Sequence, residues 1–332
     1  MEKGKNTILL IDANALIHRA YHGLPSLKTK KGVLVNAVYG FTSSVLSAIK
    51  EFHPEYIVIA FDVGKKTFRN DEYKEYKANR VKMDDELAEQ LPLVRKVVEA
   101  FNWPEFGVKN FEADDVIGTI CSKVSNFQFS ISNSNQKKLK TDNCKLKTIV
   151  VTGDMDTLQL VNDNVSVYSM SRGIKKAEVF TPEKVKEKYG FEGKYLVDYK
   201  GLRGDPSDNI PGVKGIGEKS ATDLIKRYGS IENLYTKISN FQFSISNQLF
   251  KSKYQMSKKI AELLLNYKEQ AYMSKKLATI REDTPLDFRL EDAKVAHYDP
   301  EKVKKVFDEF EFKSLLAKLP ESKVRVQQKS LF

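Results

Sequence analysis

Three apolar runs along the chain each end in an aspartate. The segments are 8–12, 56–62 and 148–154, and their last residues are Asp12, Asp62 and Asp154. Continuous apolar, largely β-branched runs of this length are typical of strands buried on both faces of a parallel sheet. Because ligands bind beyond the carboxyl ends of parallel strands, we expect these aspartates to meet at one edge of the sheet.

Segments with helical periodicity lie between these strands and dominate the chain after about residue 180. The predicted helices are 34–52, 84–101, 182–189, 193–202, 219–228, 231–235 and 255–267. Alternating strands and helices indicate an α/β fold with a mostly parallel central sheet and flanking helices. We therefore expect an α/β core over residues 1–178, a mainly helical domain over 179–295 and a C-terminal extension over 296–332.

One nine-residue sequence occurs twice, at 125–133 and at 239–247. No structural repeat surrounds either copy, so the pattern is not that of a solenoid. Both copies are rich in polar residues and follow helical segments. We interpret them as surface insertions, and a duplicated binding element is the alternative.

Composition favours a polyanionic partner. The 332 residues carry a formal net charge of +11, and the pI is near 9.2. This charge suits nucleic acid but also fits a protein that is merely soluble. No apolar run is long enough to span a membrane. The two cysteines, Cys121 and Cys144, cannot build a disulfide framework, so we expect a cytoplasmic protein with Cys121 in its core.

Other common chemistries leave no signature in the sequence. The four histidines lack the spacing of a zinc site. There is no Ser-His-Asp or Cys-His signature and no P-loop for phosphate binding.

Acidic residues gather just after the predicted strands, at the start of a helix and in a later loop. This set has nine members: Asp12, Asp62, Glu112, Asp114, Asp115, Asp154, Asp156, Asp205 and Asp208. Like charges at one sheet edge repel strongly unless cations separate them. Mg²⁺ takes oxygen ligands, and two such ions can promote phosphodiester cleavage. The alternative is that the group 112–115 caps a helix and the others are ordinary loop aspartates.

Residues 68–80 combine cations with aromatic rings. At helical spacing, Tyr73, Lys77 and Arg80 would share one face. Such a face suits phosphate contact and base stacking on a single nucleic-acid strand. The alternative is a solvated helix stabilised by Glu–Lys pairs.

A glycine-rich segment follows the last acidic pair, over residues 205–221. Gly215 and Gly217 permit a tight turn whose amides can face a phosphate, and a helix that starts near Lys219 adds its positive end. Lys214 and Lys219 flank this turn. We therefore expect the segment to hold a phosphate backbone.

These motifs closely resemble the 5′-nuclease domain of bacterial DNA polymerase I, within the flap endonuclease family. The resemblance covers residues 5 to about 318 and is most specific in segments 10–14, 112–115, 152–156 and 204–217. The gap between Asp115 and Asp154 is longer here than is usual in that family, and the first nonamer lies inside it. No polymerase domain follows, so we expect a stand-alone nuclease or a detached domain, with a separate DNA polymerase as a candidate partner.

The resemblance implies a hydrolase that uses two Mg²⁺ or Mn²⁺ ions to cut DNA near a junction of duplex and 5′ single strand, in replication and repair. By position, Asp12, Asp62, Glu112 and Asp114 match the first metal cluster, and the other five carboxylates match the second cluster and its outer shell. Lys77 and Arg80 match residues of an arch, here around 64–96, that steer the scissile phosphate. Residues 212–221 match a helix–three-turn–helix element that grips duplex DNA and often holds K⁺.

Further contacts are expected from the same comparison. Those with DNA are Arg19, Arg69, Tyr73, Lys74, Tyr76, Lys200, Lys214, Gly215, Gly217, Lys219 and Ser220. The tail is similar to the peptide that binds the bacterial sliding clamp, through Gln328, Leu331 and Phe332, although Lys329 stands where leucine is usual. We expect a monomer that does not enter membranes. The rival functions are a PIN-type ribonuclease and an inactive DNA-binding scaffold.

Overall fold

A six-stranded sheet forms the centre of the molecule in the computed structural model, which describes residues 6–64, 66–133, 146–170, 176–239, 256–295 and 298–319. The strands are β1 (Thr7–Asp12), β2 (Tyr56–Ala60), β3 (Glu105–Phe106), β4 (Lys147–Thr152), β5 (Val165–Ser169) and β6 (Glu178–Phe180). Their order is β3-β2-β1-β4-β5-β6, and every neighbouring pair is parallel except β5 with β6. The predicted, mostly parallel α/β sheet is confirmed.

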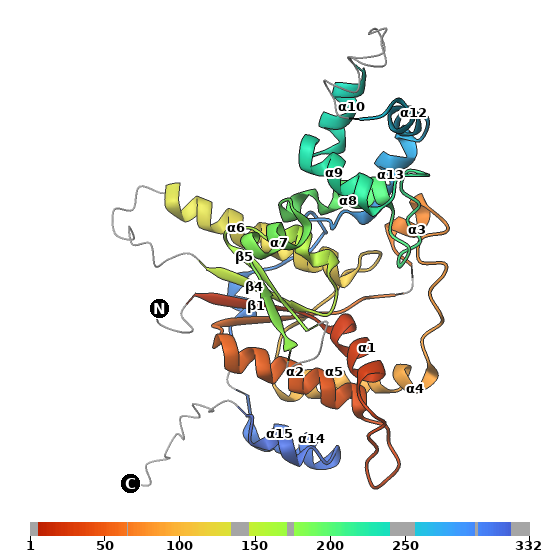
Figure 1. The fold of residues 1–332 in the computed structure, drawn as a ribbon. Coiled ribbons are helices and arrows are strands. Elements are labelled where there is room, and N and C mark those ends of the chain that lie inside the picture. The colour runs from red at the N-terminus through yellow and green to blue at the C-terminus, as the bar shows by residue number, and fades with distance from the viewer. Residues whose placement is uncertain are drawn as a thin grey trace, which may run out of the picture.

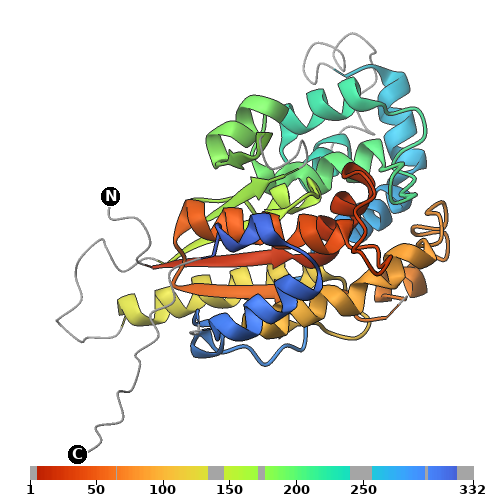
Figure 2. The ribbon, with the colours of Figure 1, turned by 90° about the horizontal axis from the view of Figure 1, so that it is seen from below.

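Helices cover both faces of this sheet (Figure 1, Figure 2). Those of the first half are α1 (Ala13–Gly23), α2 (Asn36–Phe52), α3 (Phe68–Glu72), α4 (Asp85–Ala88), α5 (Gln90–Ala100) and α6 (Ala113–Asn133). Those of the second half are α7 (Pro182–Tyr189), α8 (Leu196–Arg203), α9 (Glu218–Tyr228), α10 (Ile231–Ser239), α12 (Lys258–Asn266), α13 (Lys268–Ala278), α14 (Pro300–Glu309) and α15 (Lys313–Leu316). The 3₁₀ turns are η2 (Asp156–Leu160), η4 (Gly193–Tyr195) and η5 (Leu290–Ala293).

The two faces of β1 belong to two different hydrophobic clusters, because successive side chains of a strand point to opposite sides. Leu9 and Ile11 pack on the face that carries α1, α2 and α5. Ile8 and Leu10 pack on the face that carries α6. This second cluster continues without a break into the helical half of the chain, through residues such as Leu224. The helical region therefore shares its core with the sheet.

The C-terminal helices α14 and α15 return to the first face of the sheet and lie below α2 and α5 in Figure 1. The Phe307 ring lies 5.9 Å from that of Phe101, which directly follows α5. The Phe312 ring lies 5.3 Å from that of Tyr39 on α2. The described part of the predicted extension is therefore part of the folded core.

The segment 73–80 is not the helix that its spacing predicts. Helix α3 ends at Glu72, Tyr73 is extended, and Lys77 has a left-handed backbone with φ of 56°. Consequently Tyr73, Lys77 and Arg80 do not share a helical face. The contacts of Tyr76 and Lys77 described below replace regular helical hydrogen bonding in this segment.

The first nonamer is also different from its prediction, since residues 125–133 continue α6 as regular helix and do not loop out. The second copy lies outside the described residues from position 240 onward. Cys121 is buried on α6, as expected. In the part of the chain that the structure describes, no helix is long and apolar enough to cross a membrane.

Candidate active site

Asp12 lies where β1 passes into α1. Its Oδ1 accepts a hydrogen bond from the amide of Ala15 (3.0 Å) and so caps the helix, and its Oδ2 accepts one from Thr152 Oγ1 (2.6 Å). Burial, together with the charges of Asp62 and Asp154, raises the pKa of Asp12 to about 7, despite these hydrogen bonds. The three strand ends thus bring their aspartates together, as the apolar runs predict.

Asp114 lies in the first turn of α6 and faces the same group of charges. Burial, followed by the charges of Asp12, Asp154 and Glu112, raises the pKa of Asp114 well above its usual value. Its Oδ1 is buried and has no hydrogen-bond partner in the protein. A buried carboxylate oxygen without a donor is costly unless a cation satisfies it. These carboxylates fit the oxygen-rich donor set that a hard divalent cation requires.

Asp154 and Asp156 follow β4 and stand close to Asp205. The amide of Asp156 donates to Asp154 Oδ1 (2.8 Å), and Lys200 Nζ contacts both Asp156 and Asp205, the latter at 2.6 Å. Burial and the charge of Asp154 raise the pKa of Asp156 to about 6, although Lys200 opposes the shift. Lys200, expected to contact DNA, is instead held by two carboxylates and is largely buried.

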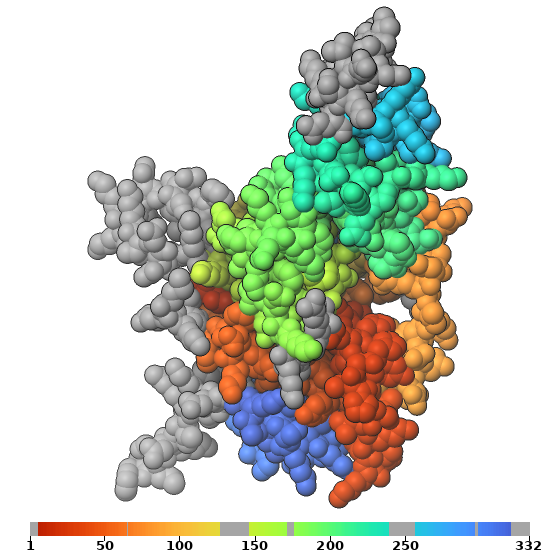
Figure 3. All heavy atoms as spheres, in the orientation of Figure 1, coloured from red at the N-terminus to blue at the C-terminus, as the bar shows by residue number. Residues whose placement is uncertain are grey.

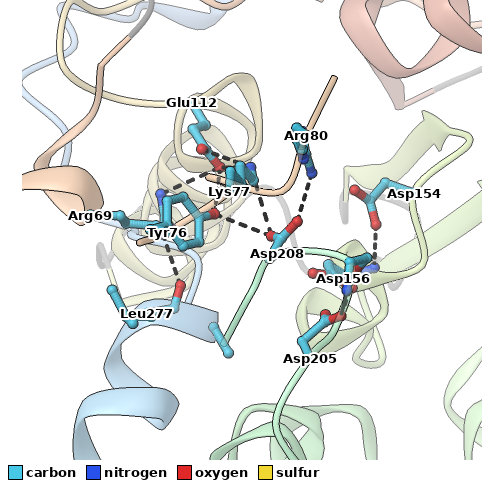
Figure 4. Close-up of polar contacts among 12 residues, drawn as sticks. Arg69, Tyr76, Lys77, Arg80, Glu112, Asp154, Asp156, Asp205, Asp208 and Leu277 are labelled. Carbon is cyan, nitrogen blue, oxygen red and sulfur yellow. Dashed lines mark hydrogen bonds and ion pairs between the residues drawn. The ribbon is translucent and has the colours of Figure 1, made fainter. Parts of the chain in front are cut away.

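Tyr76, Lys77 and Arg80 lie beside the remaining carboxylates, Glu112 and Asp208 (Figure 4). They belong to residues 64–96, the segment predicted to form an arch and named the arch below. Lys77 Nζ donates to both oxygens of Glu112 at 2.8 Å, and Arg80 donates to Asp208 at 2.6 Å. The hydroxyl of Tyr76 donates to Asp208 at 3.2 Å. Burial works to lower the pKa of Lys77, but the charges of Glu112 and Asp208 outweigh it and raise the pKa. The two predicted catalytic cations therefore lie at the acidic site.

Backbone contacts fix the arch against the loop that carries Asp205 and Asp208. The amide of Lys77 donates to the carbonyl of Asp208 (2.9 Å), and Asn79 Nδ2 donates to that of Pro206 (2.7 Å). Asn209 Nδ2 returns a bond to the carbonyl of Glu75 (2.7 Å). The space-filling view shows the arch segment, in orange, against the helical region, in teal, along one side of the molecule (Figure 3).

Asp115 and Arg69 satisfy each other inside the protein. Arg69 NH1 and NH2 donate to the two oxygens of Asp115 at 2.8 and 2.7 Å, and the side chain of Asp115 is 0% exposed. The backbone amides of Glu112 and Arg281 also donate hydrogen bonds to the carboxylate of Asp115, at 3.0 and 2.9 Å. This geometry argues against the metal-ligand role predicted for Asp115 and the DNA contact predicted for Arg69. Tyr76 is buried as well (4% exposed), which argues against its predicted contact with DNA.

The described residues contain no group of three or more His, Cys, Asp or Glu side chains already arranged around a metal position. Several predicted ligands are turned toward lysine and arginine instead: Glu112 toward Lys77, Asp208 toward Arg80, and Asp205 toward Lys200. The cationic side chains thus stand where the acidic site requires positive charge. Asp62 accepts from the amide of Ala113 (2.7 Å), which links the end of β2 to α6.

The glycine-rich turn lies between α8 and α9. Val213 and Ile216 are buried and anchor it, whereas Lys214, Gly215, Gly217 and Lys219 are exposed. Gly215 has φ of 89°, a left-handed value that favours glycine. Helix α9 begins at Glu218, one residue before the predicted start, with Ser220 half-buried in its first turn. The turn therefore presents its lysines and a helix N-terminus to solvent.

The other residues predicted to contact DNA or a partner differ in their positions and surroundings. Arg19 on α1 lies beside Gly153, directly before Asp154. Lys74 is exposed, and the hydroxyl of Tyr73 donates to Glu75 (2.9 Å). Gln328, Leu331 and Phe332 lie outside the described residues. Sequence reasoning missed Thr152, whose hydroxyl bonds to Asp12; a polar residue directly after an apolar run was the available signal.

A parallel sheet whose carboxyl edge gathers acidic side chains, next to a helical region with an exposed lysine- and glycine-rich turn, defines a class of nucleases acting on nucleic-acid backbones. Residues 7–190 match the family model of the 5′-3′ exonuclease N-terminal resolvase-like domain. Residues 191–301 match that of the 5′-3′ exonuclease C-terminal SAM fold. The chain belongs to this 5′-3′ exonuclease family.

Relatives support the same family. DNA polymerase I of Bacillus caldotenax is 38% identical over 315 residues, which is 95% of this chain and 32% of the relative. That of Bacillus subtilis is 37% identical over 324 residues, or 98% of this chain and 33% of the relative. The chain thus spans about a third of the length of these proteins. The fold is similar to that of T5 5′-exonuclease with bound zinc, with a TM-score of 0.59 at 20% identity, covering 92% of this chain and 98% of the other.

Proposed function

We propose that this chain is a structure-specific 5′-3′ exonuclease and 5′-flap endonuclease that hydrolyses DNA phosphodiesters with two divalent cations, Mg²⁺ or Mn²⁺. The observation that carries the proposal is the meeting of carboxylates from three strand ends, the start of α6 and the 205–208 loop, under an arch that contributes Lys77 and Arg80. The flap endonuclease of bacteriophage T5, which shares the fold with a TM-score of 0.60, is described in a complex with DNA and metal ions.

The carboxylates would hold the cations in two groups. Asp12, Asp62, Glu112 and Asp114 form the first group, and Asp154, Asp156, Asp205 and Asp208 form the second. When bound, two divalent cations activate water and stabilise the leaving oxygen of a phosphodiester. Burial keeps the site of Asp12 and Asp114 poorly hydrated, which strengthens every electrostatic interaction inside it.

Lys77 and Arg80 would contact the scissile phosphate. Both side chains already lie over the site, where they pair with Glu112 and Asp208. A phosphate that replaces these partners would receive two positive charges where negative charge develops in the transition state. The exposed turn at Lys214–Lys219 would hold the duplex beside the junction through its amides and lysines, without reading bases.

The decisive experiment is Mg²⁺-dependent cleavage of a labelled 5′-flap DNA, run beside single-stranded RNA. We expect cleavage of the DNA near the junction and none of the RNA. An Asp114→Asn variant is the matched control for the chemistry, because it keeps the volume of the side chain and removes its charge. Cleavage of the RNA alone would identify a PIN-type ribonuclease, and tight DNA binding without any cleavage would identify an inactive scaffold.

Further partners belong to the same proposal. A K⁺ ion bound at residues 212–221 would be tested by replacing K⁺ with tetramethylammonium in duplex-binding assays.

A sliding clamp would bind through Gln328, Leu331 and Phe332, and a Leu331→Ala/Phe332→Ala variant would lose that binding. We propose that the chain acts as a monomer and cooperates with a separate DNA polymerase.

A further inference from the structure

Helix α13 holds the glycine-rich turn at one end. Ser274 Oγ accepts a hydrogen bond from the amide of Gly212 (3.0 Å), and Gln270 Nε2 donates to the carbonyl of the same residue (2.5 Å). Ser274 is fully buried. Both backbone groups of Gly212 are thus hydrogen-bonded to one helix, which anchors the start of the turn to α13.

The other end of α13 contacts the arch and α6. Arg69 Nε and NH2 donate to the carbonyls of Leu277 (2.9 Å) and Thr279 (2.8 Å). The amide of Arg281 donates to Asp115 Oδ1 (2.9 Å), and Asp115 also accepts from the amide of Glu112. We name residues 277–281 the α13 strap. It passes so close to α6 that a Cβ on Gly118 would lie 2.7 Å from the carbonyl oxygen of Arg281.

Gln159 joins this strap to the turn that carries Asp156. Its Nε2 donates to the carbonyls of Asp156 (3.0 Å) and Ala278 (3.1 Å), and its Oε1 accepts from the amide of Ile280 (2.9 Å). The carboxamide of Gln159 thus forms hydrogen bonds both with its own turn, at Asp156, and with the α13 strap, at Ala278 and Ile280. All three of these hydrogen bonds join the Gln159 side chain to backbone groups. Its effect on chemistry must therefore pass through the position of Asp156.

We propose that Gln159 is a positioning residue, which sets Asp156 relative to the α13 strap and thereby couples the duplex-holding turn to the acidic site. This inference rests on the proposed nuclease function. About eight residues of helix separate Gln270 from Ala278, which is roughly 12 Å of rigid α-helix. The effect of duplex binding at the turn therefore reaches the carboxylates through this helix and the direct hydrogen bonds at its end.

The test compares Gln159→Met with Gln90→Met. Methionine keeps the volume and removes all hydrogen bonds. Gln90 is a matched control because it is buried (1% exposed), accepts from the amide of Ala37 (2.9 Å) and donates to Asn36 (3.1 Å), on the other face of the sheet. We expect Gln159→Met to lower the single-turnover cleavage rate by about 10- to 100-fold and to raise the Mg²⁺ concentration for half-maximal rate. Its affinity for flap DNA without divalent cations should change less than about twofold.

Hydrogen exchange gives a readout that does not depend on activity. In Gln159→Met, peptides covering 277–281 should exchange faster than in the wild type, while exchange in β1 and β4 stays unchanged; Gln90→Met should leave the strap unaffected. Unchanged exchange in the strap, or a rate loss no larger than the loss of folded protein, would overturn the inference. If the wild type itself does not cut DNA, the proposed function fails, and the exchange result still decides whether Gln159 holds the strap.

Discussion

Two adjacent aspartates on α6 have opposite surroundings. Asp114 faces the acidic site with an unpartnered Oδ1, whereas Asp115 is enclosed by Arg69 and two amides. Neighbouring residues of a helix point about 100° apart, so one faces the site when the other faces the core. The sequence shows two equivalent carboxylates, and only the helix orientation separates a candidate ligand from a structural ion pair.

Replacing Arg69 by methionine should strongly destabilise the protein. It would leave the carboxylate of Asp115 buried without its partner, at a cost of about 3–5 kcal/mol. Urea unfolding followed by circular dichroism would measure the change. The double variant Arg69→Met/Asp115→Asn should be less destabilised than the sum of the single variants. Additive losses would contradict a direct, buried pair.

The stability of the protein without divalent cations should depend on the charge of Asp12. Its pKa is raised from 3.8 to about 7, so the folded state holds this proton more tightly than the unfolded state. The stabilisation is complete below pH 3.8 and is lost as the pH rises through about 7. Thermal melts in EDTA should therefore show Tm falling from about pH 5 to 8. Asp12→Asn should flatten this slope, and an equal slope would refute the assignment.

Asp156→Asn should lower the rate of cleavage without weakening DNA binding. The substitution removes a proposed metal ligand and one negative charge near the phosphate, so we expect a loss of at least about a hundredfold in single-turnover rate. Affinity for flap DNA should be equal or tighter, because repulsion with phosphate falls. Near-normal cleavage by the variant would show that Asp156 is not a ligand.

At the scale of elements, apolar patterning predicted β1, β2 and β4 and the segments that form α2 and α5, but it missed α1 and α13. The runs ending in Asp12, Asp62 and Asp154 are β1, β2 and β4, or end within two residues of these strands. Strands β3, β5 and β6 were missed. Two or three residues at a sheet edge, as in β3 and β6, carry no periodic signal, and the five residues of β5 form only a short run. The error over 73–80 has a different cause: Tyr76 and Lys77 are fixed by tertiary contacts to Glu112 and Asp208, which local spacing cannot reveal.

The exposed turn between α8 and α9 leads to a prediction of how the affinity for DNA depends on salt concentration. If exposed Lys219 contacts a phosphate, Lys219→Ala should reduce the slope of log affinity against log salt concentration by roughly 0.9, the value for one phosphate contact. Fluorescence anisotropy with duplexes of two unrelated sequences would measure it. Lys304→Ala, an exposed lysine on α14, is the control and should leave the slope unchanged. A base-sequence preference would contradict a grip on the backbone.

At the scale of the whole molecule, one core joins regions that the sequence suggests are separate. The cluster that contains Ile8 also contains Leu224 and Leu264, so α9 and α12 share a core with the sheet. Domain boundaries read from composition describe changes in secondary structure, because continuity of packing depends on contacts between distant residues. The same limit explains why the site was predictable as a set of residues, while its ion pairs with Lys200, Lys77 and Arg69 were not.

The return of α14 to the first face of the sheet gives a final prediction. Phe307 is 1% exposed, and its ring lies 5.9 Å from those of both Phe101 and Phe312. Phe307→Ala should therefore lower the free energy of unfolding by about 3–5 kcal/mol, through lost burial and a new cavity. Lys304→Ala on the same helix should change it by less than about 0.5 kcal/mol. Because this contact lies on the sheet face opposite the helical region, cleavage per folded molecule should stay unchanged. Chemical unfolding with parallel single-turnover assays would check both values, and a stable Phe307→Ala protein would show that α14 is only loosely attached.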